Sequence, residues 1–374
     1  MGKRTFLFGA GFSKAVAKAQ TMKEIWGSFE KIYEKEKRAS SNNRVSWFNK
    51  LDNFIKNIEE LAYKQLTKDI NKIEEGIREN LEYLFTLIDM HTLYNADFNF
   101  GSKKSIDSYP VIPFEFTNKD ELAEIRTILL TYLYITFEQV EGNQLLNEFA
   151  SIINKTDEII TFNYDLLIEK ALWRKGIWSP HKGYVGVTDF VEKNDYKDFE
   201  ESKKISNIKL HKMHGSISWD VPKKMFNNKE IKIKLENDKG QFYYEDLNKI
   251  ISREPKLYKK NKSYQGKHLP PWILPSFVKP FDKRQIYKIW KSAIKKISNT
   301  KELVIIGYSF RPEDTNSQLL LANLPSESKI ILVNPDPDVK DRLENDLGYK
   351  VDKHYNFVED YLKNFKNSIR RIDK

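Results

Sequence analysis

The sequence contains no cysteine among its 374 residues. This absence excludes disulfide bonds, iron–sulfur clusters, zinc sites with thiolate ligands and catalysis by a cysteine nucleophile. Long hydrophobic runs are also missing, since no stretch approaches the roughly 20 apolar residues of a membrane-spanning helix. The apolar run near the N-terminus is too short for the hydrophobic region of a secretory signal. We therefore expect a cytoplasmic protein with no membrane partner.

The composition is that of a folded protein with a polar surface. Hydrophobic residues make up 40% of the chain and aromatic residues 13%, which argues against wholesale disorder. Charged residues make up 31%, and the mean hydropathy is −0.62. A chain of this length can hold a large α/β domain together with insertions.

The net charge of +10 favours an acidic partner, and nucleic acid is one such partner. The densest basic run covers residues 253–268, where lysines and arginine alternate with two tyrosines. A solvated loop is the simpler interpretation of this run, and contact with nucleic acid is the alternative.

Five short apolar runs predict the strands of a buried parallel sheet, because each is followed by a turn signal or a polar residue. They are TFLFG (Thr5 to Gly9), EIITFNYD (Glu158 to Asp165), IKLHKMHGS (Ile208 to Ser216), ELVIIGYS (Glu302 to Ser309) and KIILVNPD (Lys329 to Asp336). In open parallel sheets, ligands bind beyond the carboxyl ends of the strands. The residues that follow these five runs are therefore the candidate site.

Two insertions separate the strands. Residues 21–150 carry apolar stripes at helical spacing, of which Leu129 and Leu133 are part, and such stripes are typical of core positions. We predict a helical subdomain there, inserted after the first strand into a domain formed by residues 1–20 and 151–374. Alternating residues and an Asp-Lys-Gly turn within residues 220–268 predict a small β-hairpin.

A glycine turn follows the first strand. Gly9 and Gly11 allow the backbone to turn tightly and to approach a ligand closely. Ser13 is suited to a helix N-cap, and the unpaired N–H groups of a helix N-terminus attract anions such as pyrophosphate. The third glycine of G-x-G-x-x-G is missing, and there is no GxxxxGK[ST] loop. Alone, the turn is equally well explained as a plain connection between strand and helix.

Polar residues follow the next two predicted strands. Asn163 and Asp165 come after the second strand, and His214 follows the third. Taken singly, Asn163 and His214 are more simply explained by packing than by chemistry. Glycine turn, asparagine and histidine on three successive strand ends are harder to explain in that way, and together they predict a ligand site.

The segments GAGFS, TFNYD, MHGS, IIGYS and VNPD, in this order, resemble the signature segments of the sirtuin-like NAD-binding family. The resemblance spans the chain and is strongest to bacterial members that hydrolyse NAD in antiphage defence. It implies a Rossmann-like α/β fold with a parallel sheet, NAD as the substrate and no metal.

The resemblance also implies roles for individual residues. Asn163 would be the catalytic asparagine near the nicotinamide ribose, and His214 the catalytic histidine. The residues that would bind the dinucleotide are Gly9, Ala10, Gly11, Phe12, Ser13, Gly307, Ser309 and Asn334. Asp165 is interpreted equally well as a ligand contact or as support for the Asn163 turn. Asp314 matches an acidic position of the defence branch, although a helix cap explains it equally well.

Two departures from the family pattern bear on the activity. Deacylating sirtuins carry a zinc ribbon with four cysteines, and this sequence has none. The usual continuation after the glycine turn is replaced by KAVAKAQTMKEIW. Hydrolysis of NAD to ADP-ribose and nicotinamide, in abortive infection, is therefore the leading hypothesis. The alternatives are a non-catalytic module that binds NAD or ADP-ribose, and a sirtuin-type deacylase or ADP-ribosyltransferase.

The resemblance extends to assembly. Chains of this kind resemble the NADase subunit encoded beside HerA-type ATPases, which forms large rings with that partner. A homo-oligomer and a HerA-type ATPase partner are therefore expected, with the helical insertion as the surface for self-association.

Overall fold

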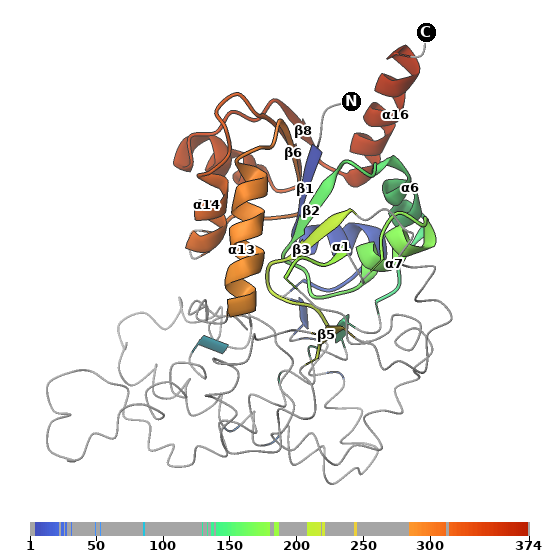
Figure 1. Cartoon of the computed structure of the whole chain (residues 1–374), viewed down its shortest axis with the longest axis vertical. Coiled ribbons are helices and arrows are strands. Elements are labelled where there is room, and N and C mark those ends of the chain that lie inside the picture. The colour runs from blue at the N-terminus through green and yellow to red at the C-terminus, as the bar shows by residue number, and fades with distance from the viewer. Residues whose placement is uncertain are drawn as a thin grey trace, which may run out of the picture.

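The computed structural model describes residues 4–21, 24–25, 27, 31, 49, 53, 85–86, 129, 133, 136–137, 140–179, 183–186, 208–217, 219–220, 243–244, 284–311 and 314–372. A six-stranded sheet with the order β3-β2-β1-β6-β7-β8 forms the centre of this part of the chain (Figure 1). Every pair of neighbouring strands in it is parallel. The strands are β1 (Arg4–Phe8), β2 (Glu158–Thr161), β3 (Lys209–Lys212), β6 (Glu302–Ile306), β7 (Lys329–Val333) and β8 (Lys353–Tyr355).

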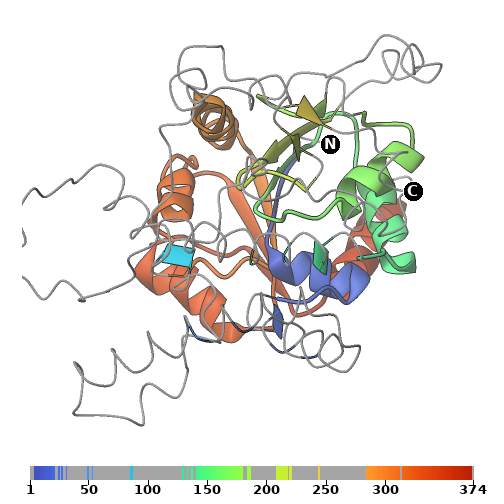
Figure 2. The same cartoon turned by 90° about the horizontal axis from the view of Figure 1, so that it is seen from below.

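Helices cover both faces of the sheet (Figure 2). One face carries α1 (Ala10–Ala17), α6 (Gln144–Ile152) and α7 (Leu167–Arg174), and the other carries α13 (Arg284–Ile297) and α14 (Thr315–Leu321) (Figures 1 and 2). The C-terminal part adds α15 (Pro337–Asp341), the π-helical turn η4 (Arg342–Asp346) and α16 (Val358–Ile372). α16 packs against α6 and β8.

The central strand β1 is buried along its whole length, as expected for a strand with helices on both faces. Its aromatic side chains fix the neighbouring helices. The ring of Phe8 stacks on Phe12 of α1 with 4.1 Å between centroids, and it meets Phe149 of α6 edge-on at 5.6 Å. These stacked and edge-on contacts add to the burial of the rings and set α1 directly behind the end of β1.

The five strands predicted from the sequence are confirmed, and so is the Rossmann-like α/β class. β8 was not predicted. It has only three residues, none of them aliphatic, and it lies at the edge of the sheet, so it lacks the apolar run that marked the others.

The two predicted insertions lie mostly outside the described residues, and both stay predictions. Within them, Leu129 and Leu133 are buried in the main core, as their stripe predicted. β4 (Trp219–Asp220) pairs antiparallel with β5 (Tyr243–Tyr244). The basic run at residues 253–268 also lies outside the described residues. Among the helices that are described, none is both long and apolar enough to cross a membrane.

Candidate functional site

The carboxyl ends of five strands are aligned in one row. In register, Phe8 of β1 stands beside Thr161 of β2 and Ile306 of β6, and the row continues to Lys212 of β3 and Val333 of β7. The next residue of each strand continues this row, since Gly9, Phe162, Met213 and Gly307 each donate an N–H to the last carbonyl of a neighbouring strand. The segments predicted to form a site therefore leave the sheet side by side.

The glycine turn after β1 packs directly on the turn after β6. A Cβ atom on Gly9 would stand 2.5 Å from the carbonyl oxygen of Gly307, and one on Gly11 would stand 2.7 Å from its Cα. Gly307 has φ +62, and a Cβ there would stand 2.3 Å from the backbone nitrogen of Phe12. Contacts under 3.0 Å leave no room for a side chain, so the two turns can approach only as glycines.

The same contact uses the amides of the glycine turn. Gly9 N–H donates to Ile306, Gly11 N–H to the carbonyl of Gly307 at 2.9 Å, and Phe12 N–H to the carbonyl of Gly9. Ala10, the first residue of α1, is exposed. The glycines thus serve first to join two loops, and the exposed end of α1 at Ala10 is the part of the turn that faces outward.

Asn163 is fixed on this turn by two hydrogen bonds. Its Nδ2 donates to the carbonyl of Gly9 and to Ser13 Oγ, both at 2.9 Å. A carbonyl oxygen can only accept, so the amide nitrogen, and not Oδ1, must face Gly9. Within the described residues no donor reaches Oδ1 of Asn163. The half-buried side chain therefore presents an acceptor that the described residues do not use.

Ser13 and Asp165 support this arrangement from inside. Ser13 Oγ donates to Asp165 Oδ2 at 2.6 Å, and the N–H of Leu167 donates to Asp165 Oδ1 at 3.0 Å. Both carboxylate oxygens of this buried aspartate are occupied, which favours the supporting role over a ligand contact. The expected N-cap role of Ser13 is wrong. Gly9 holds the N-cap position of α1, because the helix begins at the turn itself, and Ser13 lies inside the helix.

His214 lies against the two aromatic residues that flank Asn163. Its ring meets Phe162 edge-on at 5.1 Å and lies tilted over Tyr164 at 6.0 Å. The loop that carries it is tied to the Asn163 loop, because the N–H of Ile217 donates to the carbonyl of Tyr164 at 3.0 Å. The structure thus brings the loops of Asn163 and His214 together beside the glycine turn.

The other histidine of this segment has a different environment. His211 is buried within β3, and its two ring nitrogens lie 3.3 Å from the carbonyl oxygen of Ile159 and 3.1 Å from Ser292 Oγ of α13. Burial lowers its pKa to about 4. His211 is therefore neutral at physiological pH and closed off by the sheet, whereas the half-buried His214 lies beyond the strand end.

Hydrogen bonds connect the segment after β6 to the segment after β7. Asn334 donates from Nδ2 to the carbonyl of Tyr308 at 3.2 Å and accepts from the N–H of Asp336 at 3.1 Å. The carbonyl of Ser309 accepts from the guanidinium of Arg342. Gly307, Ser309 and Asn334 are thus close neighbours, and the side chain of Asn334 is largely used in holding the loop.

Asp314 does not act as the helix cap that its position suggested. It occupies the N-cap position of α14, but its side chain makes no capping hydrogen bond. Its Oδ2 instead accepts from the hydroxyl of Tyr308. The ring of Tyr308 stacks on Phe162 at 4.3 Å, so Asp314 is connected to the aromatic residues beside His214.

Sequence reasoning missed a buried ion pair beneath Asn163. Lys212, at the end of β3, places Nζ 2.9 Å from Oε1 of Glu169 in α7, and both side chains are at most 1% exposed. Lys212 Nζ also donates to the carbonyl of Asp165 at 2.5 Å. Burial raises the pKa of Glu169, against the opposing charge of Lys212. The sequence contains no clear signal for this pair, because β3 also contains Lys209 and His211 and so does not set Lys212 apart.

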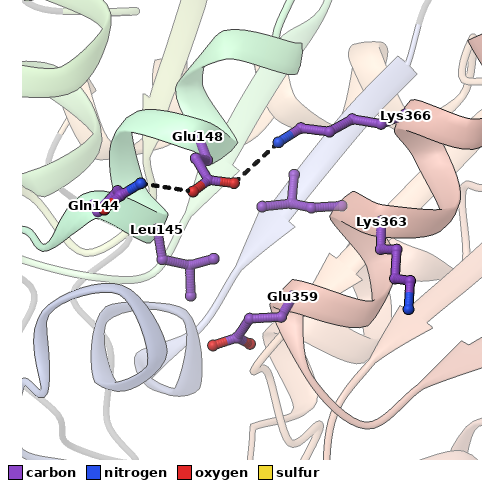
Figure 3. Close-up of a pocket in the computed structure, with 7 residues that line it drawn as sticks. Gln144, Leu145, Glu148, Glu359, Lys363 and Lys366 are labelled. Carbon is purple, nitrogen blue, oxygen red and sulfur yellow. Dashed lines mark hydrogen bonds and ion pairs between the residues drawn. The ribbon is translucent and has the colours of Figure 1, made fainter.

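Several grooves are bounded by described residues, and one of about 470 Å³ is lined by Lys14, Lys18 and Glu24 beside the second half of α1. A groove of about 500 Å³ runs between α6 and α16, where Lys366 bridges to Glu148 across an apolar floor that includes Leu145 (Figure 3). A smaller groove lies at the amino edge of the sheet, beside Arg4. None of these three grooves is lined by a residue predicted for the site. No cluster of acidic residues and histidines able to hold a metal occurs among the described residues.

Comparisons with known proteins place this arrangement in a family. A family model described as a SIR2-like domain matches residues 157–357, from the start of β2 to beyond β8. Similar solved structures include a Sir2 homologue in complex with NAD, at 14% identity over 68% of this chain and 77% of that chain, with a TM-score of 0.36. Another is a mutant Sir2 homologue in complex with 2′-O-acetyl ADP ribose, at 13% identity over 68% and 78%, also with a TM-score of 0.36. A search of curated proteins gave no match. The family model covers more than half of the chain, and with the parallel Rossmann-type sheet it shows that the protein belongs to the SIR2-like domain family.

Proposed function

We propose that the protein is an NAD hydrolase that cleaves the bond between nicotinamide and ribose. The observation that carries this proposal is the position of Asn163: its Nδ2 is bound to the glycine turn, no donor of a described residue reaches its Oδ1, and His214 lies against the neighbouring aromatic rings. Membership in the SIR2-like family supports NAD as the ligand. The substrate would lie along the carboxyl edge of the sheet, with its diphosphate near Ala10 and its nicotinamide ribose near Asn163.

The chemistry requires positioning more than acid catalysis. The nicotinamide ring of NAD carries a positive charge and departs as a neutral molecule, so the leaving group needs no proton. The positive charge passes to the ribose, and the transition state resembles an oxocarbenium ion. Asn163 Oδ1 can accept a hydrogen bond from a ribose hydroxyl or from the attacking water without adding charge. The imidazole of His214 is a side chain of the type that can take the proton of that water near neutral pH. Water then adds at the ribose carbon, and ADP-ribose and nicotinamide are the products.

Protein deacylation is the family activity that the sequence favours least. A zinc ribbon of four cysteines supports the acyl-lysine groove of deacylating sirtuins, and this chain contains no cysteine. Incubation of the purified protein with NAD, with and without an acylated peptide, separates the activities. Nicotinamide and ADP-ribose that form at the same rate in both samples support hydrolysis. Nicotinamide release that requires the peptide identifies a deacylase, and modification of added protein identifies a transferase.

A binding module is the third outcome of the same experiment. Saturable binding of NAD or ADP-ribose without nicotinamide release would show a regulatory module and would refute the hydrolase. Calorimetry with each nucleotide measures this directly. A site built only to bind would not need an unused amide oxygen beside an imidazole at the ribose.

We further propose that hydrolysis serves antiphage defence by depleting NAD. The order of the five signature segments supports this branch of the family. Expression in a bacterial host followed by phage challenge tests it, with the NAD concentration measured over time. NAD should fall on infection in cells that carry the wild type and stay constant with Asn163→Ala. Light scattering with and without a HerA-type ATPase tests the assembly, which we expect to be oligomeric at micromolar concentration.

A further inference from the structure

The ion pair between Lys212 and Glu169 is deeply buried. Both side chains are almost fully inaccessible, and the hydroxyl of Tyr184 also donates to Glu169 Oε1, at 3.2 Å. The pair joins β3 to α7 on the inner side of the loop that carries Asn163. Taking two such charges out of water costs several kcal/mol for each ion, and a well-packed apolar pair is often at least as stable. Stability alone therefore gives little reason for charges at this place.

A chain of hydrogen bonds connects the pair to Asn163. Lys212 Nζ donates to the carbonyl of Asp165 at 2.5 Å. The carboxylate of Asp165 accepts from the hydroxyl of Ser13 at 2.6 Å, and Ser13 Oγ accepts from Nδ2 of Asn163 at 2.9 Å. These four residues come from β3, the loop after β2 and α1. This chain of hydrogen bonds therefore runs from the buried ion pair to Asn163.

The direction of each hydrogen bond in this chain is determined. An ammonium group can only donate, so the carbonyl of Asp165 must accept from Lys212. Ser13 Oγ donates to Asp165 Oδ2, so its single proton is used there and only its lone pairs are left for Asn163. Asn163 must then offer Nδ2 to both Gly9 and Ser13, and Oδ1 is left as the acceptor that no donor of a described residue reaches.

We propose that Lys212 and Glu169 are positioning residues, which hold Asp165 and thereby fix the amide orientation of Asn163. The proposal rests on the proposed NAD hydrolysis. Lys212 anchors the backbone at Asp165, two residues from Asn163, and Glu169 holds the ammonium group of Lys212 in place. Neither side chain touches substrate, because both are buried. An error of about 1 Å in the position of a catalytic group can lower the rate by roughly 10²-fold.

The test removes the pair as a unit. Lys212→Met combined with Glu169→Met replaces both charges with apolar chains of similar length, which avoids leaving one buried charge alone. The matched control is Arg4→Met combined with Asp157→Met. That pair is similarly buried, has a distance of 2.7 Å, and lies at the opposite, amino end of the strands. Circular dichroism and thermal unfolding establish that each variant is folded.

We expect the loss of the ion pair to lower the turnover number and to leave the apparent affinity for NAD nearly unchanged. The kcat for nicotinamide release should fall about 10-fold or more in the Lys212/Glu169 variant, with KM for NAD within about twofold, because an interaction made in the transition state has been weakened. In the Arg4/Asp157 control, kcat should stay within about twofold of the wild type. In an Asn163→Ala background, loss of the Lys212/Glu169 pair should lower kcat no further, because residues that act through one group are not additive.

Every other outcome refutes either the positioning role of Lys212 and Glu169 or the proposed function. A folded Lys212/Glu169 variant with wild-type kcat refutes the positioning role. So does an equal loss of kcat in the control, or a further loss in the Asn163→Ala background, since both indicate a general structural effect. If the double variant does not fold, Ser13→Ala breaks the same chain, and a wild-type kcat there refutes the proposal. A wild type that releases no nicotinamide refutes the proposed function itself, and the positioning role with it.

Discussion

Asn163 donates a hydrogen bond to the carbonyl of Gly9, 154 residues earlier in the chain, at 2.9 Å. This contact joins the loop after β2 to the turn after β1, and Gly307 joins the same turn to the loop after β6. The candidate site is therefore a set of strand-end loops connected by hydrogen bonds, on a sheet whose register aligns them. Its geometry depends on small contacts that single substitutions can break.

Gly307→Ala should destabilise the protein by about 3 kcal/mol or more. The left-handed conformation at φ +62 costs a non-glycine residue roughly 1–2 kcal/mol, and the new Cβ would overlap the backbone of Phe12 and Gly11. Gly176→Ala is the matched control, because Gly176 has φ +70 and a Cβ added there would meet no other atom within 4 Å. Gly176→Ala should lose only the roughly 1–2 kcal/mol that the left-handed conformation costs. Urea unfolding of both variants gives the comparison, and equal losses would contradict the close packing of the two turns.

Ser13→Ala should lower nicotinamide release about 10-fold while the protein stays folded. The substitution removes one of the two acceptors that hold the Asn163 amide and leaves Asp165 Oδ2 without its donor. An unsatisfied buried acceptor costs about 1–3 kcal/mol. Steady-state kinetics with thermal unfolding separate the effect on the rate from the effect on stability. Ser298→Ala, on an exposed helix end, provides the control and should change neither. A wild-type rate in Ser13→Ala would show that the hydroxyl does not orient Asn163.

His211 should make the protein less stable as the pH falls from about 6.5 to 4. Its folded-state pKa of about 4 lies below the unfolded value of 6.5, so in this window the unfolded chain binds a proton that the folded protein does not. The contribution of neutral His211 to the free energy of unfolding is complete above pH 6.5 and is lost as the pH falls toward 4. The free energy of unfolding then changes by at most about 1.4 kcal/mol per pH unit because of this residue.

Urea unfolding between pH 4 and 7 measures this effect as the difference between wild type and His211→Asn. Asparagine has a similar hydrogen-bonding capacity and does not titrate, so the variant should show a flatter dependence on pH. Parallel curves for the two proteins would mean that the pKa of His211 is the same in the folded and unfolded states, which would contradict the lowered value.

α16 should be held by its apolar face and not by its ion pair to α6. Lys366 and Glu148 are 2.9 Å apart but 45% and 41% exposed, so Lys366→Ala should cost less than about 1 kcal/mol (Figure 3). Leu362 lies in the same helix and is 2% exposed, so Leu362→Ala should cost about 2–5 kcal/mol. Denaturant unfolding of both variants tests the ranking, and the reverse order would contradict it.

The main sheet could be predicted because its strands are continuous apolar runs followed by recognisable turns. Phe6, Leu7 and Phe8 are fully buried, as are Leu303, Val304 and Ile305, and this burial on two faces is what makes such runs conspicuous. β8 has no such run, because an edge strand of three residues needs few apolar contacts. The grouping of the strand-end loops followed from the rule that parallel strands end on one side.

The internal chemistry of the site could not be predicted in the same way. The roles of Ser13 and Asp165 depend on a hydrogen bond between residues 152 positions apart, and no local pattern encodes it. Lys212 has the sequence context of a surface lysine, although its ammonium group is buried against Glu169. Asp314 occupies a capping position but bonds to Tyr308, because the packing of Tyr308 on Phe162 brings the hydroxyl within reach.

The most direct test of the account is the rate of nicotinamide release from NAD by Asn163→Ala relative to the wild type. Asn143→Ala is the matched control, because Asn143 also bonds to α1, through the carbonyl of Ala15, but caps α6 instead of facing the strand ends. We predict that Asn163→Ala lowers turnover by about 10²-fold or more. Asn143→Ala should keep the wild-type rate and lose about 1 kcal/mol of stability. A folded Asn163→Ala protein that releases nicotinamide at the wild-type rate would contradict the account.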